Sequence, residues 1–259
     1  MYEFTADGPV TAHLHVSGGR CAVHTGDGPT VTVDVTPAAS WRPGDRKAAE
    51  RTEVRFDAGV LTVRNGQAGA WTDGSVRLRV TVPANSALTY ASHSADLEAH
   101  GRLASLAADS GSGGVKADHI TGDVRLEATS GDVELGTVGG SLTYTIRSGH
   151  LRVGHTAGPV RGTSASGDLR LGTADQDVHV ETGSGDVRIG TVRTGTLHAT
   201  TSSGDVTVGV EKGVGVRPTL RTNSGDRHGD LAHGAPADGF GEITVDITTT
   251  SGDITLRRA

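Results

Sequence analysis

The chain has 259 residues, a formal net charge of −6, only 3% aromatic residues and one cysteine. The negative charge argues against a nucleic-acid partner, and a single cysteine excludes both a disulfide framework and a cysteine-based metal site. Because Phe and Trp are scarce while glycine occurs 39 times, we expect a core of stacked Val, Leu, Ile and Thr side chains.

The first residues, 1–7, lack the basic segment and the apolar core of a signal peptide. No apolar run reaches the roughly 18 residues that a membrane-spanning helix needs. We therefore expect a cytoplasmic protein without a membrane span.

Residues 1–90 show strand-like alternation without a strict period. The pattern predicts strands at 10–16, 30–36, 60–64 and 76–82, a turn at 83–86 and a single helical turn at 44–51. A stack of strands has open edges at both ends that must be covered. We interpret 1–90 as a β-rich N-terminal cap, and expect a second cap near 228–259, after an insertion that begins at about residue 227.

From residue 91 onward a Ser-Gly-Asp motif recurs, for the most part every 18 residues. Such a period indicates stacked units that cannot bury their apolar faces alone. One copy has His in place of Asp, and the last copies are spaced less regularly. The copies are Ser130-Gly131-Asp132, Ser148-Gly149-His150, Ser166-Gly167-Asp168, Ser184-Gly185-Asp186, Ser203-Gly204-Asp205, Ser224-Gly225-Asp226 and Ser251-Gly252-Asp253.

Each period divides into two halves that place apolar residues two positions apart, as a strand with one buried face does. Gly-Asp supplies the turn before each strand. The inward positions include Val124, Leu126, Val133, Leu135, Leu142, Tyr144, Leu169 and Leu171, and the outward ones Arg125, Glu134, Arg152, Arg161, Arg170, His179, Arg188 and His198. The fold class is all-β: a parallel β-solenoid over 91–259, with 18-residue coils of two short strands each.

The repeat resembles a bacterial β-strand-repeat family of unknown function known as "putative adhesins". The resemblance rests on Ser-Gly-Asp-Val-x-[Leu/Ile]-Gly-Thr-Val at 130–138 and 184–192, on the Arg-Val-Thr-Val-Pro-Ala-Asn-Ser stretch at 79–86, and on the closing segment 250–254. It implies a β-solenoid and supplies no catalytic motif.

Six aspartates of the repeat, here called the aspartate ladder, are expected along one corner: Asp132, Asp168, Asp186, Asp205, Asp226 and Asp253. Carboxylates so placed suggest calcium. The residue after each Asp is apolar or Arg, however, and the second Gly pair of the calcium-binding nonapeptide is missing. We favour Asp residues that cap their own turns, and predict no metal and no cofactor.

The best candidate binding surface is the arginine stripe, Arg152, Arg170 and Arg188, stacked on one outer face. Guanidinium groups suit carboxylate or phosphate, although charge balance with the aspartate ladder explains the stripe as well. A protein partner or an acidic ligand would fit. His179 and His198, near Arg161, match in adjacent coils, but two His residues alone are a weak metal signal.

Two functions remain open. Repetition favours a non-catalytic interaction or scaffold protein, which could also self-associate through its ends. The alternative is an enzyme of cyclase, isomerase or lyase type that acts on a small metabolite with the irregular residues of the first coils or in a groove beside the cap. Those residues are Tyr90, His93, Lys116, His119, Tyr144, His150 and His155, and the weak catalytic candidates are His150, Asp132, Asp168, Tyr144 and His119.

Overall fold

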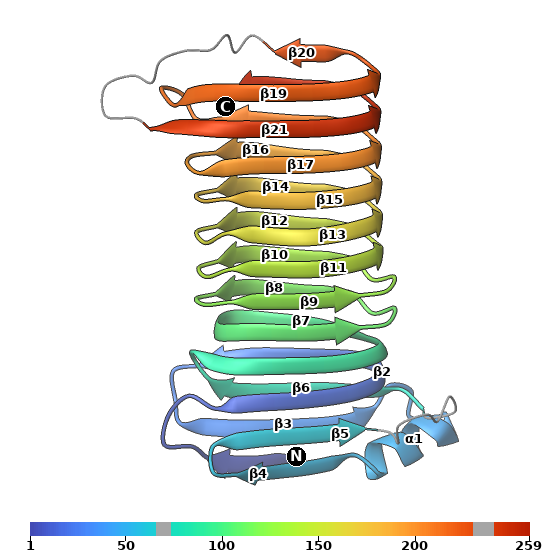
Figure 1. The fold of residues 1–259 in the computed structure, drawn as a ribbon. Helices are drawn as coiled ribbons and strands as arrows, with labels where there is room; N and C mark the ends of the chain where they lie inside the picture. The colour runs from blue at the N-terminus through green and yellow to red at the C-terminus, as the bar shows by residue number, and fades with distance from the viewer. Residues whose placement is uncertain (66–73, 230–240) are drawn as a thin grey trace. The chain divides into compact units, whose positions relative to one another are not determined.

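The structure is a computed structural model that describes residues 1–65, 74–229 and 241–259. The described residues form strands and one short helix (Figure 1). The chain divides into two compact units, Met1–Glu134 and Leu135–Ala259. Within the described residues, no helix is both long enough and apolar enough to cross a membrane.

In the first unit, the predicted strands and the helical turn are present, and the strands extend further than the sequence pattern indicates. The elements are β1 (Tyr2–Thr5), β2 (Thr11–Gly26), β3 (Thr30–Pro37), α1 (Pro43–Glu50), β4 (Glu53–Asp57), β5 (Val60–Asn65), β6 (Val76–Pro83), β7 (Ser86–Ser110), β8 (Val115–Ile120) and β9 (Val124–Ala128).

The long strand β2 organises this unit. It pairs in parallel with β5 and β6 on one side and with β7 on the other, while β1, β3 and β4 add antiparallel pairs. Helix α1 is attached by buried polar groups. Asn65 Nδ2 donates to Ala48 O at 3.0 Å, and both carboxylate oxygens of Asp45 accept backbone N–H groups, from Ala39 at 3.0 Å and Ser75 at 2.9 Å.

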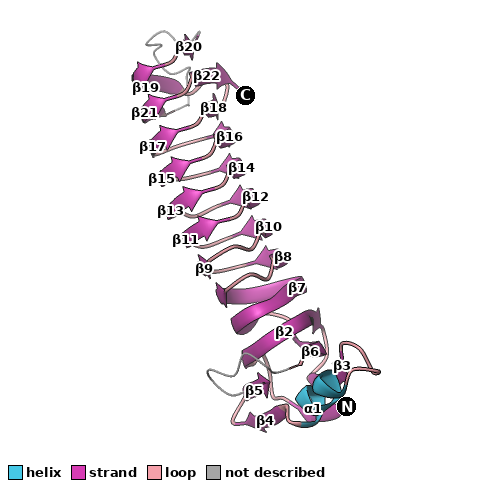
Figure 2. Ribbon diagram, turned by 90° about the vertical axis from the view of Figure 1, so that its right-hand side faces the viewer, coloured by secondary structure: helices cyan, strands magenta, loops and turns pink. Residues whose placement is uncertain are grey.

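The second unit is a stack of two-stranded coils, and β10 (Val133–Val138) runs into it from the first unit. Figure 2 shows odd-numbered strands on one side of the stack and even-numbered strands on the other. The strands are β11 (Leu142–Ser148), β12 (Leu151–Thr156), β13 (Val160–Ser166), β14 (Leu169–Ala174), β15 (Val178–Ser184), β16 (Val187–Val192), β17 (Thr196–Ser203), β18 (Val206–Val210), β19 (Gly215–Ser224), β20 (Arg227–Gly229), β21 (Glu242–Ser251) and β22 (Ile254–Arg258).

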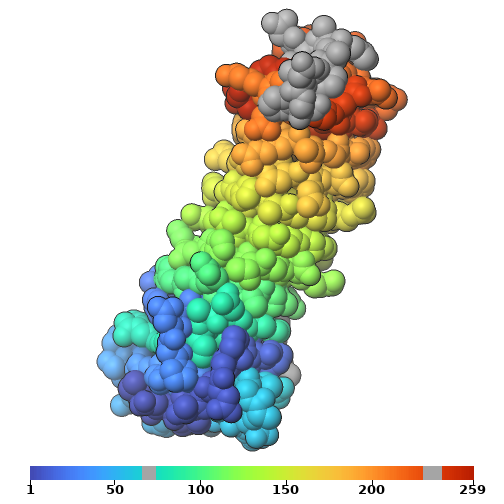
Figure 3. Space-filling view, turned by 90° about the vertical axis from the view of Figure 1, so that its left-hand side faces the viewer, coloured from blue at the N-terminus to red at the C-terminus, as the bar shows by residue number. Residues whose placement is uncertain are grey.

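The register confirms the 18-residue coil with two strands. Leu142 of β11 pairs in parallel with Val160 of β13, and Leu151 of β12 with Leu169 of β14. The apolar positions named from the sequence are all buried, and successive coils pack against one another along this unit (Figure 3). The prediction of an all-β parallel β-solenoid is therefore confirmed.

Glycine is required at the corner before the even-numbered strands. Gly167 has a φ of +128°, a conformation that side chains rarely adopt, and a Cβ there would lie 2.0 Å from the carbonyl oxygen of Gly149 in the preceding coil. The Ser-Gly-Asp motif thus meets two needs at once, a left-handed backbone and close stacking of consecutive turns.

The last coils do not stack in chain order. Strand β21 pairs with β17 on one side and with β19 on the other, and β22 lies likewise between β18 and β20. The coil β21–β22 therefore lies between the coil β17–β18 and the coil β19–β20 (Figure 1). Strand β19 contains Pro218, which has no backbone N–H to donate to a neighbouring strand. Strand β21 contains no proline and buries Ile243, Val245 and Ile247. The expected insertion after residue 227 falls largely on 230–240, outside the described residues, and the predicted cap boundaries remain predictions.

Candidate binding surface

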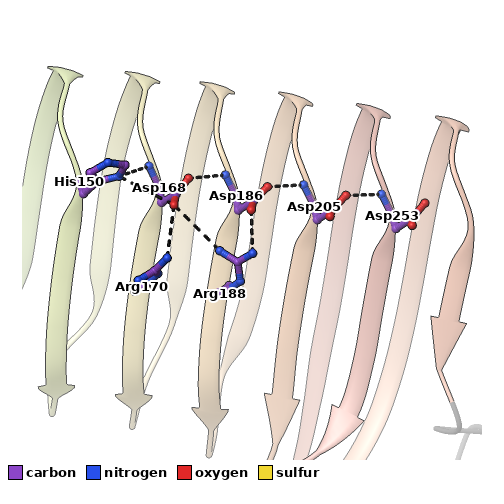
Figure 4. Close-up of polar contacts among 7 residues, drawn as sticks. All are labelled: His150, Asp168, Arg170, Asp186, Arg188, Asp205 and Asp253. Carbon is purple, nitrogen blue, oxygen red and sulfur yellow. Dashed lines mark hydrogen bonds and ion pairs between the residues drawn. The ribbon is translucent and has the colours of Figure 1, made fainter.

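The aspartate ladder of the second unit links one coil to the next. The backbone N–H of Asp186 donates to Asp168 Oδ1 at 3.1 Å, and that of Asp205 donates to Asp186 Oδ1 at 2.9 Å (Figure 4). The order then departs from the sequence: Asp253 N–H donates to Asp205 Oδ1 at 2.9 Å, and Asp226 N–H to Asp253 Oδ1 at 2.8 Å. We expect each Asp to cap its own turn, but the carboxylates of Asp168, Asp186, Asp205 and Asp253 instead accept the N–H of the adjacent coil.

His150 takes an aspartate position in this series. Its Nδ1 accepts the backbone N–H of Asp168 at 3.1 Å, so the ring does the same work as a ladder carboxylate. Its Nδ1 also lies 3.8 Å from Asp168 Oδ2. Two of the catalytic candidates, His150 and Asp168, are thus neighbours, and both are used in holding consecutive turns together.

The arginine stripe lies beside the ladder, as the sequence predicted. Arg152, Arg170 and Arg188 are in register on β12, β14 and β16, and all are exposed. Arg188 Nη2 lies 2.7 Å from Asp186 Oδ2, and Arg170 Nη2 lies 3.6 Å from Asp168 Oδ2. Within the described residues, Arg152 makes no ion pair. The stripe therefore carries three guanidinium groups against two carboxylates.

A feature not anticipated from the sequence follows the stripe two residues further along each strand. Gly154, Gly172 and Gly190, here called the glycine strip, are exposed and stacked in adjacent coils. A Cβ on Gly172 would lie 2.2 Å from Gly154 O, and one on Gly190 would lie 2.5 Å from Gly172 O. The strip is therefore bare backbone beside a row of cations. The signal was present in the sequence, because Arg-x-Gly recurs with the same period.

Charged side chains border the far side of the glycine strip. Asp175 accepts from His155 Nε2 at 2.9 Å and from Arg193 Nη1 at 2.8 Å, and Arg193 Nε lies 3.5 Å from Glu211 Oε1. Burial raises the pKa of Asp175, but the hydrogen bonds from His155 and Arg193 outweigh it and hold the pKa below its ordinary value. The cations of this border are thus paired with carboxylates, whereas Arg152 of the arginine stripe has no acidic partner within the described residues.

The other catalytic candidates are not gathered around one centre. Tyr144 is buried in the core of the second unit, and this burial raises its pKa. Asp132 and His119 belong to the first unit, where Asp132 is exposed and His119 is half-buried opposite Arg102.

Two of the remaining irregular residues make local polar contacts. The hydroxyl of Tyr90 is buried and donates to Ala95 O at 2.6 Å, and Lys116 Nζ lies 3.2 Å from Glu134 Oε1. His93 is exposed in β7.

His179 and His198 do stack, with ring centroids 4.8 Å apart. Each has an acidic neighbour: His179 Nε2 is 3.3 Å from Glu181 Oε1, and His198 Nδ1 is 3.5 Å from Asp246 Oδ2. In the part of the chain that the structure describes, no three His, Cys, Asp or Glu residues form a group that could hold a metal ion.

Comparisons with known proteins identify one family. The family model described as Toastrack DUF4097 matches residues 79–257. A search of the curated proteins finds no match.

Several solved structures are similar at low identity. A "putative adhesin" from Parabacteroides distasonis is 15% identical, with a TM-score of 0.44, and one from Bacteroides fragilis is 10% identical, with a TM-score of 0.42. A "putative lipid binding protein" from Parabacteroides distasonis is 12% identical, with a TM-score of 0.45. Each match covers 98% of this chain and 95% of the other.

Proposed function

Since the chain belongs to the Toastrack DUF4097 family, whose name assigns no activity, we propose its function from its own surface: a non-catalytic solenoid that binds an extended acidic segment of a partner protein. The observation that carries this proposal is the arginine stripe beside the glycine strip. Repeated coils present the same chemistry at regular intervals, which suits an extended ligand better than a single reaction centre.

The arginine stripe can accept carboxylates at little cost. A guanidinium group has five N–H donors, and the ion pairs with Asp168 and Asp186 occupy only part of them. The side chains of Arg170 and Arg188 are 49% and 45% exposed, so these pairs contribute little and exchange readily for a ligand. Meanwhile, the Oδ1 atoms of both aspartates are engaged by backbone N–H groups.

The glycine strip supplies the surface on which a chain could lie. No side chain projects from Gly154, Gly172 or Gly190, so a ligand can approach the strands closely while its carboxylates reach the stripe. Neighbouring arginines of the stripe lie on adjacent strands, which are about 4.8 Å apart. An extended acidic segment can therefore engage several guanidinium groups at once, which raises its effective affinity.

The test is fluorescence anisotropy of a labelled oligo-glutamate peptide titrated with the full chain. We expect saturable binding that weakens as salt is added, because exposed charges are screened. The triple variant Arg152→Gln, Arg170→Gln and Arg188→Gln should lose at least about tenfold in affinity, since each tenfold loss corresponds to about 1.4 kcal/mol. Its thermal unfolding should stay close to that of the wild type.

A matched control removes the same charge from the opposite sheet: Arg161→Gln, Arg217→Gln and Arg221→Gln, three exposed arginines of β13 and β19. This variant should bind the peptide almost as well as the wild type. An equal loss in both variants would show an effect of net charge alone. If the peptide does not bind, or if a nucleoside triphosphate binds and the peptide does not, the proposal of a protein partner is overturned.

A further inference from the structure

The first unit contains a hollow that the proposed function does not use. It is open to solvent and offers about 570 Å³ over the middle of the sheet in which β2 lies between β5 and β7. This volume is in the range of small-molecule sites, roughly 300–1,000 Å³. The outward residues there form two rows across the strands, Thr62–His13–Thr89 and Arg64–His15–Ala91.

The shape of the hollow follows from the side chains in these rows. Thr62 and Thr89 are short and leave space on both sides of His13, while His15 has the short Ala91 on one side and Arg64 on the other. Alternation along β2 turns His13 and His15 to the same face, while Leu14 between them is buried. Two imidazole rings and one guanidinium group therefore share a small area of the sheet.

The described lining of the hollow contains basic side chains but no acidic ones. Within the described residues, His13, His15 and Arg64 take part in no ion pair or hydrogen bond through their side chains. The acidic residue in register with Arg64 is Glu53 of β4, whose Oε2 lies 3.2 Å from Arg55 Nη2. Arg64 is thus an arginine with free donors in a protein of net charge −6.

We propose that this hollow binds a small molecule with two or more anionic oxygen groups, held by Arg64 and by the two histidines of β2. Arginine offers two parallel donors to one carboxylate or phosphate. The ring N–H groups of His13 and His15 can reach a second anionic group, and the hydroxyls of Thr62 and Thr89 add neutral donors. The shared chemistry is that of polycarboxylates and of phosphates, and the probes below separate the two.

The test is isothermal titration calorimetry of the full chain with citrate, with inorganic pyrophosphate and with acetate. We expect citrate or pyrophosphate to bind with a defined stoichiometry and acetate to bind much more weakly, because it offers a single anionic group. Arg64→Gln and His15→Gln should each weaken binding about tenfold or more. Arg64→Lys, which keeps the charge but loses the paired donors, should lie in between.

The control variants are Arg161→Gln and His179→Gln, an arginine and a histidine in register on an exposed sheet of the second unit. They should leave the affinity unchanged. A second measurement needs no substitution: the ring signals of His13 and His15 in NMR spectra should shift on addition of the anion, while those of His179 and His198 should not. No heat with either anion, equal losses in the controls, or shifts in all four histidines would overturn the proposal.

Discussion

Tyr144 is the largest residue in the core of the second unit, and one glycine makes room for it. Gly162 is its neighbour in register, and a Cβ on Gly162 would lie 2.3 Å from the Tyr144 ring. Gly162→Val should therefore overpack the core and destabilise the protein by about 1–3 kcal/mol in chemical denaturation. Combining it with Tyr144→Val should restore most of that loss, whereas simply additive losses would contradict the contact.

Asp186 represents the aspartate ladder at the scale of one residue. It accepts the N–H of Asp205 with one oxygen and pairs with Arg188 through the other. Asp186→Ala should cost about 1–2 kcal/mol of unfolding free energy, because the Asp205 N–H loses a charged acceptor. Asp186→Asn keeps an acceptor of the same shape and should cost less. Equal losses for the two variants would mean that the amide acceptor contributes nothing.

Asp175 predicts a pH dependence. Burial raises its pKa, but His155 and Arg193 lower it by more, so the folded pKa lies below the ordinary value of 3.8. A depressed folded pKa gives stability that is present above the unfolded pKa and is lost as the pH falls through the folded pKa. Asp175→Asn should therefore lower the Tm at neutral pH, and the difference from the wild type should shrink below about pH 4. A constant difference would contradict this.

At the scale of elements, the position of β21 between β17 and β19 can be tested by comparing two truncations. Ile247 of β21 is fully buried, while Leu220 of β19, its partner in register, is half-buried. Ile247→Ala should cost about 2–5 kcal/mol, as other large-to-small core changes do. Leu220→Ala should cost clearly less, because a strand at the edge buries less. The reverse ranking would place β19 inside instead.

The spacing of the Ser-Gly-Asp copies decides how far the stacking order of the coils can be predicted from the sequence. Where copies of the motif are 18 residues apart, as from His150 to Asp186, chain order equals stacking order and the register can be read directly. Past Asp205 the spacing no longer identifies neighbours, since Asp253 bonds to a residue 48 positions earlier. Pro218 was the one local sign that β19 lies at an edge. The glycine strip was visible as a period, but its exposure required the fold.

The hollow of the first unit illustrates the other limit of sequence analysis. The strands that carry its lining residues are far apart in the chain and share no repeat period. The sequence therefore does not indicate that Arg64 lies beside His15, or that Thr89 lies beside His13. The bonds of the aspartate ladder could not be predicted either, because a carboxylate at a turn can accept from its own turn or from the next. Only the stacking geometry decides between the two.

At the scale of the whole molecule, a stack of coils should respond locally to damage. Gly167→Ala would strain a left-handed backbone and press a methyl group on the turn below. In a repeat architecture, stability is held mainly between nearest neighbours. Hydrogen exchange should therefore speed up over about 142–192 and change little over 11–110. A uniform loss of protection along the chain would indicate a single cooperative unit.

The order of the last coils has a consequence for biosynthesis. On the ribosome, β17 and β18 emerge first, then β19 and β20, and only afterwards β21 and β22. The exposed edge of β17 thus meets β19 before its native neighbour has been translated. Both segments carry the same Ser-Gly motif in register, so β19 can pair with this edge in the same alignment until β21 is available. The native stacking of this end therefore cannot follow the order of synthesis, because β21 and β22 must be present before β19 and β20 can take their final places.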